Sequence, residues 1–334
     1  MVRAAIVGLG WWGKTLVNAA HGKSQDIQFT KAATGTRAKA EDFCRDKNIT
    51  LLDNYDQVLA DPDVDAVVLA SPHSMHEDQV KRAAAAGKHV FCEKPFTLTA
   101  AAAERALAAA DKAKVTLAVG FNRRFHPSMQ ELKRRIRAGE LGVFETCIGE
   151  HTANPAASIQ PGYWRADPNE TPAGAMTGIG IHTVDTMINL FGRISEVHCI
   201  TAKRDSPHVD DTTTVLVKFA DGASGTFFCS LSTVPNYRFA VYGSKGFAEI
   251  MKPTLEELRI APLPDPKLGH LAVLKPEVIQ TPGFDTVLAE LTAFAAAVNK
   301  TATYPVPLDE VYHGTQVFEV IVNSAKSGRA MAVG

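Results

Sequence analysis

The chain has 334 residues, 46% of them hydrophobic and 21% charged, so it is long enough for two domains that each bury a core. Its 35 basic side chains balance 36 acidic ones, which excludes a broad basic face for nucleic acid and favours a small-molecule partner. The five cysteines form no C-x-x-C pair, and no apolar stretch is long enough to span a membrane. We therefore expect a cytoplasmic protein without a disulfide framework, metal site or membrane anchor.

Residues 1–121 alternate predicted strands with predicted helices. Apolar runs predict strands at 2–7, 27–33, near 51, and at 65–70, 89–92 and 115–119. Helical patterns occupy 14–20, 37–47, 56–59, 75–86 and 99–113. This alternation predicts an α/β domain over 1–121, a doubly wound parallel sheet of the Rossmann type.

The pattern changes after residue 121. Helices are predicted at 128–138, 175–191, 284–299 and 310–327, and a long loop at 152–173. Strands are predicted at 143–151, 197–202, 212–219, 224–230 and 239–242, with glycine-containing turns between the later ones. We therefore expect a second, α+β domain over 122–334 on an open, mostly antiparallel sheet, whose last helix is able to pack back on the first domain.

A glycine turn follows the first predicted strand and fits two motifs. Residues 8–13 (GLGWWG) match the dinucleotide pattern G-x-G-x-x-G, which predicts cofactor contacts from Gly8, Gly10, Trp11, Trp12 and Gly13. With residues 14–15 (KT) the same stretch also matches the phosphate loop of nucleotide triphosphatases. That loop needs an acid at the end of a neighbouring strand, and strand 65–70 ends in Ser-Pro. A dinucleotide site is favoured, with a plain glycine turn as the alternative.

The end of the second predicted strand bears on the choice of cofactor. An NAD site usually has an acid about 20 residues beyond the glycines, to bind the ribose 2′-hydroxyl. Here Thr34, Gly35, Thr36 and Arg37 stand instead. Two hydroxyls and a guanidinium suit a 2′-phosphate, so NADP is favoured over NAD. The alternative is that Arg37 is a solvated residue at the start of a helix.

Residues 86–95 (AGKHVFCEKP) resemble the A-G-K-H-V-x-x-E-K-P signature of the glucose-fructose oxidoreductase / inositol dehydrogenase / rhizopine catabolism (Gfo/Idh/MocA) family. Further matches cover nearly the whole chain: the glycine turn, 71–72 (SP), 120–125 (GFNRRF), 164–165 (WR), His182, and 243–246 (GSKG). The resemblance implies a second domain used for substrate binding and for assembly into a homodimer or homotetramer. It also implies that the cofactor lies near Ser71, Pro72, His73, Glu93 and Lys94.

The resemblance makes Lys94 a candidate catalytic residue. Ligands of open α/β sheets bind at the carboxyl ends of the strands, where Lys94 is predicted to lie. There its amine could exchange a proton with a carbinol or carbonyl oxygen, provided that burial or a nearby cation lowers its pKa. The alternative is that Lys94 only pairs with Glu93 or another acid.

A second candidate set lies beyond residue 121. Helical spacing predicts Gly178, His182 and Asp185 on one face, where the family usually has D-x-x-x-H-x-x-D, so this chain lacks the first Asp. His182 becomes the candidate partner of Lys94, with a structural histidine as the alternative. Without the Asp, we expect Lys94 to lose its proton more easily. The predicted substrate-binding residues are Arg123, Trp164, Arg165, His182 and Asp185; for Trp164 and Arg165 local packing is the alternative.

These residues predict an NAD(P)-dependent oxidoreductase. It would move a hydride between nicotinamide and a secondary alcohol or ketone of a sugar, cyclitol or related polyhydroxylated compound. Three alternatives stay open from what the resemblance implies: a redox-neutral NAD-dependent glycosidase, an aromatic dihydrodiol dehydrogenase, and a dinucleotide-dependent sensor or co-repressor without turnover. The absent Asp at Gly178 keeps the sensor open, whereas Lys94 and His182 argue against it.

Overall fold

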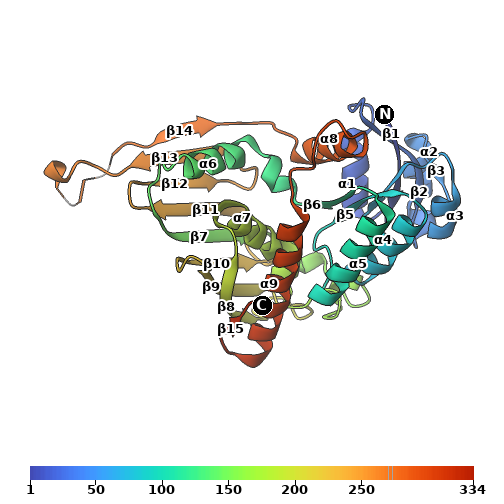
Figure 1. The fold of residues 1–334 in the computed structure, drawn as a ribbon. Helices are drawn as coiled ribbons and strands as arrows, with labels where there is room; N and C mark the ends of the chain where they lie inside the picture. The colour runs from blue at the N-terminus through green and yellow to red at the C-terminus, as the bar shows by residue number, and fades with distance from the viewer. Residues whose placement is uncertain (270, 273) are drawn as a thin grey trace. The chain divides into compact units, whose positions relative to one another are not determined.

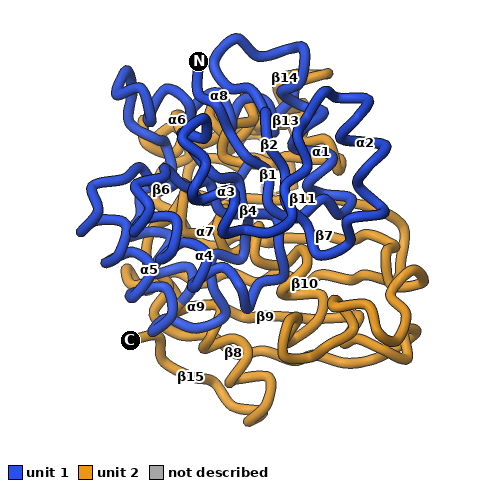
Figure 2. Tube along the Cα trace, turned by 90° about the vertical axis from the view of Figure 1, so that its right-hand side faces the viewer, with its two compact units in different colours: residues 1–122, 285–315 blue, residues 123–284, 316–334 orange. Residues whose placement is uncertain are grey.

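The computed structural model describes residues 1–269, 271–272 and 274–334, and its chain forms two compact units (Figures 1 and 2). Unit 1 comprises residues 1–122 and 285–315, and unit 2 comprises residues 123–284 and 316–334. The prediction placed all of 122–334 in the second domain, whereas residues 285–315 belong to unit 1. The physical reason is that the helix over Thr286–Val298 packs against the first helix and second strand of unit 1.

Unit 1 is built on a parallel sheet, as predicted (Figure 1). Its strands are β1 (Val2–Val7), β2 (Ile27–Ala33), β3 (Thr50–Leu51), β4 (Ala66–Leu69), β5 (His89–Glu93) and β6 (Leu117–Gly120). Their order is β3-β2-β1-β4-β5-β6, and every neighbouring pair is parallel. The chain adds β2 and β3 on one side of β1 and then adds β4, β5 and β6 on the other side. Because all the strands are parallel, the carboxyl ends of β1, β2, β4 and β5 share the edge where a dinucleotide binds in such sheets.

Helices cover this sheet. They are α1 (Trp11–Ala20), α2 (Glu41–Asp46), α3 (Tyr55–Ala60), α4 (His76–Ala85), α5 (Ala100–Ala113) and α8 (Thr286–Val298), with α9 (Leu308–Ser327) beginning in unit 1. α1 packs against α8, and α4 packs against α5. The single helix predicted over 37–47 is instead a 3-10 turn (Arg37–Lys39) followed by α2, with buried Ala40 between them.

Unit 2 is built on a larger sheet, and the predicted open, mostly antiparallel architecture is confirmed. Its strands are β7 (Phe144–Thr152), β8 (Ile194–Ala202), β9 (Thr212–Phe219), β10 (Ser224–Ser230), β11 (Asn236–Gly243), β12 (Gly246–Met251), β13 (Glu257–Pro262), β14 (Glu277–Gln280) and β15 (Met331–Ala332). Their order is β14-β13-β12-β11-β7-β10-β9-β8-β15, and only the β7–β10 pair is parallel. The sequence patterns did not predict β12 to β15.

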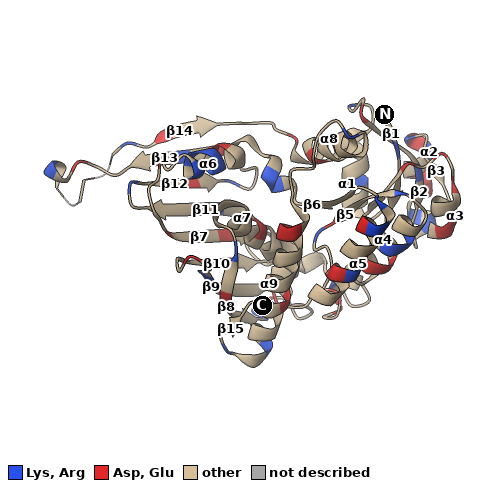
Figure 3. Cartoon of the chain, viewed as in Figure 1, with Lys and Arg blue, Asp and Glu red and all other residues tan. Residues whose placement is uncertain are grey.

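One face of the unit 2 sheet is buried. Side chains of β9 alternate between buried and exposed, as expected for a sheet with one covered face. The covering helices are α6 (Pro127–Arg137) and α7 (Ile181–Phe191), which pack against each other and against strands of the sheet. Figure 3 shows the basic residues of α6, which form ion pairs, because Arg134 and Arg135 both pair with Glu131 and Glu140.

Across the part of the chain that the structure describes, none of the helices combines the length and the apolar character needed to cross a membrane.

Candidate functional site

The glycine turn joins β1 to α1 and leaves the amino end of α1 open. Gly8 has φ +97°, and a Cβ built there would lie 2.5 Å from the Ala70 carbonyl oxygen. A Cβ at Gly13 would lie 1.9 Å from the Gly8 carbonyl oxygen, so α1 can approach the turn only with glycine there. Gly10 begins α1 without a side-chain cap, and a Cβ built on it would meet nothing within 4 Å. This uncapped helix end fits the pyrophosphate of a dinucleotide.

The side chains that follow the turn do not form a triphosphate site. Lys14 Nζ donates to the carbonyl oxygen of Lys39 at 3.1 Å and lies 5.3 Å from the ring centre of Phe43. Thr15 Oγ1 donates to the Trp11 carbonyl oxygen at 3.0 Å. Both motif residues are therefore engaged with the protein itself, which favours the dinucleotide interpretation.

Two tryptophans occupy the variable positions of the turn. Trp11 is 78% exposed, and its ring centre lies 5.4 Å from that of Trp12. Trp12 Nε1 is buried and has no hydrogen-bond partner among the described residues. An indole N–H of this kind is available to an acceptor on a bound molecule.

The end of β2 carries the residues predicted to bind the 2′ group of the cofactor. The Thr36 N–H points to Thr34 Oγ1 at 3.5 Å, and Arg37 begins the short 3-10 turn. Arg37 pairs with Asp53, at 2.8 Å between Nη1 and Oδ1, and its Nε lies 3.5 Å from Glu41. The sequence reasoning overlooked Asp53 because it follows a different strand, β3.

Lys94 lies directly after β5 and is half-buried. The side chain of buried Glu93 accepts a hydrogen bond from the Lys94 backbone N–H at 3.2 Å. The following segment is tied to the end of β4 through the ring of fully buried His76, whose nitrogens lie 3.0 Å from the Pro95 oxygen and 3.2 Å from the Ser71 oxygen. The topology thus brings Lys94 to the same edge of the sheet as the glycine turn.

The neighbouring candidates Ser71, Pro72 and His73 join β4 to α4. Ser71 Oγ donates to Gln79 Oε1 at 2.5 Å, and buried His73 lies edge-on to His76 with ring centres 5.9 Å apart. The Lys94–Pro95 peptide bond is cis. Through Gln79 and His76, Ser71 and His73 support the segment that carries Lys94. Their predicted contact with the cofactor remains a prediction.

Unit 2 has its own polar cluster, formed by Arg123, His151, His182 and Tyr237. Arg123 Nη2 lies 2.9 Å from His151 Nε2, and the Arg123 guanidinium stacks 4.3 Å from the ring centre of Tyr237. The His151 and His182 ring centres lie 6.1 Å apart. Burial lowers the pKa of Arg123 and raises that of Tyr237. Within the described residues Arg123 Nη1 is buried without a hydrogen-bond partner, so it is available to an oxygen acceptor.

Asp185 is held in a buried ion pair within unit 2. Both of its carboxylate oxygens accept hydrogen bonds from Arg124, at 2.6 to 3.0 Å, and the two side chains are only 5% and 4% exposed. Arg124 also reaches Asn189 Oδ1 at 3.3 Å. A buried, bidentate ion pair of this kind anchors α7 to the segment before α6, which gives Asp185 a structural role. Its predicted contact with substrate remains a prediction.

The predicted helical face of Gly178, His182 and Asp185 is interrupted. Residues Met176–Gly180 form a π-helix, and α7 begins only at Ile181. The α-helical spacing therefore does not continue from Gly178 to His182. A Cβ at Gly178 would meet only Leu231 methyl groups, at 3.6 and 4.0 Å, so a larger side chain has room to start there.

Trp164 and Arg165 stack on each other in the loop after β7. The Arg165 guanidinium lies 4.0 Å from the ring centre of Trp164, and its Nη1 donates to the Tyr163 hydroxyl at 3.1 Å. These contacts establish local packing for both residues. Their predicted contact with substrate remains a prediction.

The structure therefore collects the predicted residues into two groups, one in each unit. Sequence reasoning missed His151 and Tyr237 in unit 2 and Glu290 on α8 in unit 1. The sequence held a signal for two of them. His151 lies on β7 at every second position after Cys147 and Gly149, which are buried. Glu290 is the one charged residue of the apolar helix α8. A polar residue at a buried position is informative in both cases.

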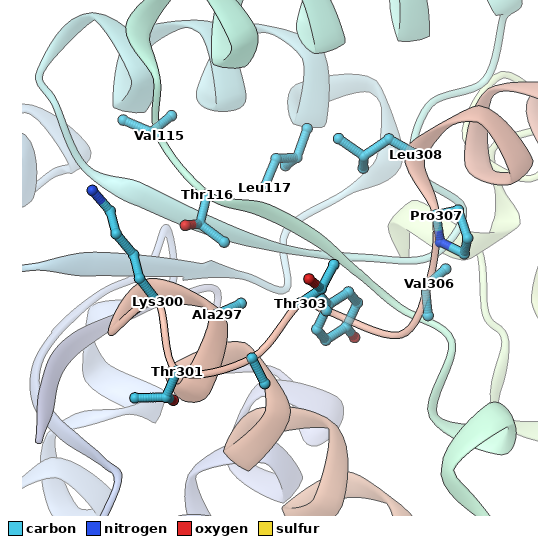
Figure 4. A pocket seen from close by; sticks show the side chains of 12 residues that line it. Val115, Thr116, Leu117, Ala297, Lys300, Thr301, Thr303, Val306, Pro307 and Leu308 are labelled. Carbon is cyan, nitrogen blue, oxygen red and sulfur yellow. The ribbon is translucent and has the colours of Figure 1, made fainter.

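A surface groove of about 690 Å³ lies elsewhere in unit 1 (Figure 4). Its lining includes Val115, Leu117, Lys300 and Tyr304. Leu117 is the first residue of β6 and pairs with Val90, so this groove lies at the amino ends of the strands. It is therefore separate from the edge that carries Lys94 and the glycine turn.

Comparison with known proteins gives a consistent result for both units. Residues 2–121 match the family model described as the oxidoreductase family with an NAD-binding Rossmann fold, and residues 129–249 match the GFO/IDH/MocA C-terminal domain. The chain is similar to an uncharacterized oxidoreductase, YrbE, of Bacillus subtilis, at 34% identity over 62% of each chain. It therefore spans less than two thirds of the length of that relative.

Other relatives have named activities. The trans-1,2-dihydrobenzene-1,2-diol dehydrogenase of Oryctolagus cuniculus is 29% identical over 68% of each chain. The aldose-aldose oxidoreductase of Caulobacter crescentus, solved with glycerol, is 25% identical over 99% of each chain, with a TM-score of 0.84. A levoglucosan dehydrogenase solved with NADH and levoglucosan has a TM-score of 0.88 over 99% of each chain, and at 22% identity it shows the fold alone.

Proposed function

The chain belongs to the Gfo/Idh/MocA family of oxidoreductases, and on that basis we propose that it is an NAD(P)-dependent dehydrogenase or reductase acting on CH–OH groups. Its substrate is a secondary alcohol or ketone of a sugar, cyclitol or related polyhydroxylated compound. The observation that carries this proposal is the position of Lys94, which follows β5 at the sheet edge where the open end of α1 lies. The dinucleotide accepts or donates the hydride.

The residues of unit 1 bind the cofactor and move the proton. Backbone N–H groups at the start of α1 bind the pyrophosphate, and Gly10 keeps the approach to them open. Lys94 takes the proton of the substrate hydroxyl during oxidation and returns it to the carbonyl oxygen during reduction. Buried Glu93 and His76 hold the segment that carries Lys94.

The polar cluster of unit 2 binds the substrate. Arg123 and His182 offer donors for its oxygens, and His151 holds the Arg123 guanidinium. Sugars, cyclitols and aromatic dihydrodiols share vicinal oxygens that such donors recognise. The aldose-aldose oxidoreductase and the dihydrodiol dehydrogenases among the relatives support this range of substrates.

NADP is the proposed cofactor. The end of β2 presents Thr34, Thr36 and Arg37 without a carboxylate of its own. Asp53 and Glu41 pair with Arg37 at the surface, where such pairs are weak, so a 2′-phosphate with two negative charges can replace them.

Assembly through the open face of the unit 2 sheet is proposed as well. Ile200 on β8, Leu216 on β9 and Phe228 on β10 are 64%, 55% and 41% exposed on adjacent strands. Apolar side chains that gather on an exposed sheet face favour burial against a second copy, as a homodimer or homotetramer. The cytoplasm is the proposed compartment, because five buried free cysteines suit a reducing environment.

The test is a panel of sugars, aryl glycosides, inositols, other polyols and aromatic dihydrodiols assayed with NAD⁺ and with NADP⁺ by nicotinamide absorbance. We expect turnover with at least one class, and turnover lower by roughly 10² to 10⁴ with the Lys94→Ala variant under the same conditions. Tight cofactor binding with no turnover on any member of the panel would replace this proposal by the sensor function. Release of a glycosidic aglycone without net change in absorbance would replace it by the redox-neutral glycosidase.

A further inference from the structure

One charged side chain lies on the otherwise apolar helix α8. Glu290 is fully buried, and within the described residues neither of its carboxylate oxygens has a hydrogen-bond partner. Burying a carboxyl group without a partner destabilises a protein, and an apolar residue would fill the same space without that cost. Packing therefore does not account for a carboxyl group at this position.

The residues on either side of Glu290 establish which way it faces. Thr286, Glu290 and Phe294 are spaced four apart and share one face of α8. Thr286 Oγ1 accepts a hydrogen bond from Asn122 Nδ2 at 2.9 Å, just beyond β6. Phe294 meets Phe91 of β5 edge to face, with ring centres 5.7 Å apart.

The position of Phe91 on β5 also indicates where Glu290 lies. Phe91 and Glu93 are two residues apart on β5, so their side chains point to the same face of the sheet. One helical turn is about as long as two strand residues. Glu290, one turn before Phe294, therefore faces the end of β5 that carries Glu93 and Lys94.

The electrostatics agree with this placement. Burial raises the pKa of Glu290 well above its usual value; the charges of Glu93 and Asp285 raise it further and that of Lys94 lowers it. Two buried carboxyl groups that face each other resist ionising together, so one of them keeps a proton.

The basic residues on the other elements that pack on α8 are not among the charges that act on Glu290. α1 and β2 also contact α8 and carry the basic residues Lys14, His21 and Lys31. Lys14 donates to the Lys39 carbonyl oxygen, and Lys31 pairs with Asp61 at 3.1 Å. His21 follows the far end of α1, away from the glycine turn. The charges acting on Glu290 are those of Glu93, Lys94 and Asp285.

We propose that Glu290 is a positioning residue of the Glu93–Lys94 site. Glu290 and Glu93 form a buried carboxyl pair, and the ionisation of Glu290 changes how strongly Lys94 holds its proton. The proposal rests on the proposed function, since it assigns Lys94 the exchange of a proton with the substrate. While Glu290 keeps its proton, it adds no negative charge beside Lys94, and Lys94 gives up its own proton more readily, as alcohol oxidation requires. When Glu290 ionises, its negative charge favours Lys94 as the ammonium that donates a proton to a carbonyl oxygen.

The first test measures Lys94 directly, without a substrate. The rate at which acetic anhydride acetylates Lys94 in the cofactor-free protein is followed against pH by peptide mass spectrometry. Glu290→Gln removes the ionisable group and should move the midpoint for Lys94 to lower pH by about one unit. Asp285→Asn makes the same change of charge at the exposed start of the same helix, where solvent screening should leave a much smaller shift. A Glu290→Gln shift no larger than that of Asp285→Asn overturns the proposal.

The second test uses the reciprocity of coupled sites. The infrared band of the protonated Glu290 carboxyl, identified by its loss in Glu290→Gln, is titrated in the wild type and in Lys94→Met. Lys94→Met should move the loss of this band to higher pH by the same amount that Glu290→Gln moves Lys94 to lower pH. An unchanged band position overturns the proposal.

A third variant guards against a folding defect. If Glu290→Gln does not fold, Glu290→Leu replaces it in both tests, because leucine fills the site without a buried polar group. Neither measurement needs turnover. A protein that shows this coupling but reduces no nicotinamide with the substrate panel would contradict the proposed function and leave the coupling intact.

Discussion

Two buried carboxyl groups, one in each unit, have opposite surroundings. In unit 2, Asp185 and Arg124 form a complete ion pair in which both carboxylate oxygens are hydrogen-bonded. In unit 1, Glu290 is buried with no hydrogen-bond partner among the described residues and lies near Glu93 and Lys94. The first arrangement stabilises the fold, whereas the second costs stability beside the residue expected to move a proton. The contrast separates a structural role from a functional one.

The largest effect is expected at Lys94, on the unit 1 side of this contrast. Lys94→Ala should lower turnover by roughly 10² to 10⁴, because a positioned acid or base is lost, and should change cofactor affinity only a few-fold. Steady-state kinetics and nicotinamide fluorescence titration measure the two quantities. Turnover equal to that of the wild type would remove Lys94 from the mechanism.

The second-largest effect is expected for the Arg124–Asp185 ion pair of unit 2. Asp185→Ala leaves the Arg124 guanidinium buried without its carboxylate and should lower the free energy of unfolding by about 3 to 5 kcal/mol. The double variant Arg124→Met/Asp185→Leu removes both charges and should be less destabilised than the single variant. Denaturant unfolding measures both. A small loss for Asp185→Ala would contradict the assignment of Asp185 as a structural residue.

An exposed ion pair extends the comparison to the surface. Arg37 pairs with Asp53, with side chains 48% and 70% exposed. Arg37→Ala should change stability by less than about 1 kcal/mol, yet weaken NADPH binding roughly tenfold or more relative to NADH. Fluorescence titrations with both cofactors provide the measurement, and equal losses for the two would contradict the NADP preference.

A smaller effect is expected at the face that includes the π-helix in unit 2. His182→Ala should reduce turnover at least about tenfold without unfolding the protein. Gly178→Asp supplies the carboxyl group of the D-x-x-x-H-x-x-D pattern. If it acts with Lys94 as that pattern implies, it should move the Lys94-dependent limb of the pH-rate profile to higher pH, because an anion favours the ammonium form. If both variants match the wild type, this face is structural, like the Arg124–Asp185 pair.

The smallest effect is the stability cost of Glu290 itself. The pKa of Glu290 is raised in the folded protein, so between the usual value near 4.5 and the raised value the folded state binds more protons than the unfolded state. Stability of the wild type relative to Glu290→Gln should therefore fall as pH increases above about 4.5. Unfolding midpoints of the two proteins over a pH series measure this, and a constant difference would show that Glu290 titrates normally.

Contiguous stretches of sequence determined much of unit 1. The doubly wound sheet, the glycine turn and the family were all predicted from residues 1–121, and each is confirmed. The physical reason is that parallel strands joined by helices place their carboxyl ends at one edge, so residues following separate strands, such as Gly8 and Lys94, meet there. The mostly antiparallel sheet of unit 2 was predicted in the same way, from period-two patterns.

Only the tertiary structure decided which side chains complete the two groups. Arg123, His151 and Tyr237 come from separate elements and meet through the pairing of β7 with β11, in which His151 lies opposite Tyr237. Glu290 reaches Lys94 because residues 285–315 return to unit 1, which no local pattern shows. Asp185 was predicted to bind substrate, and only the structure shows its buried pairing with Arg124, 61 positions away. Local patterns depend on neighbours in sequence, whereas the charge state and partners of a buried group depend on neighbours in space.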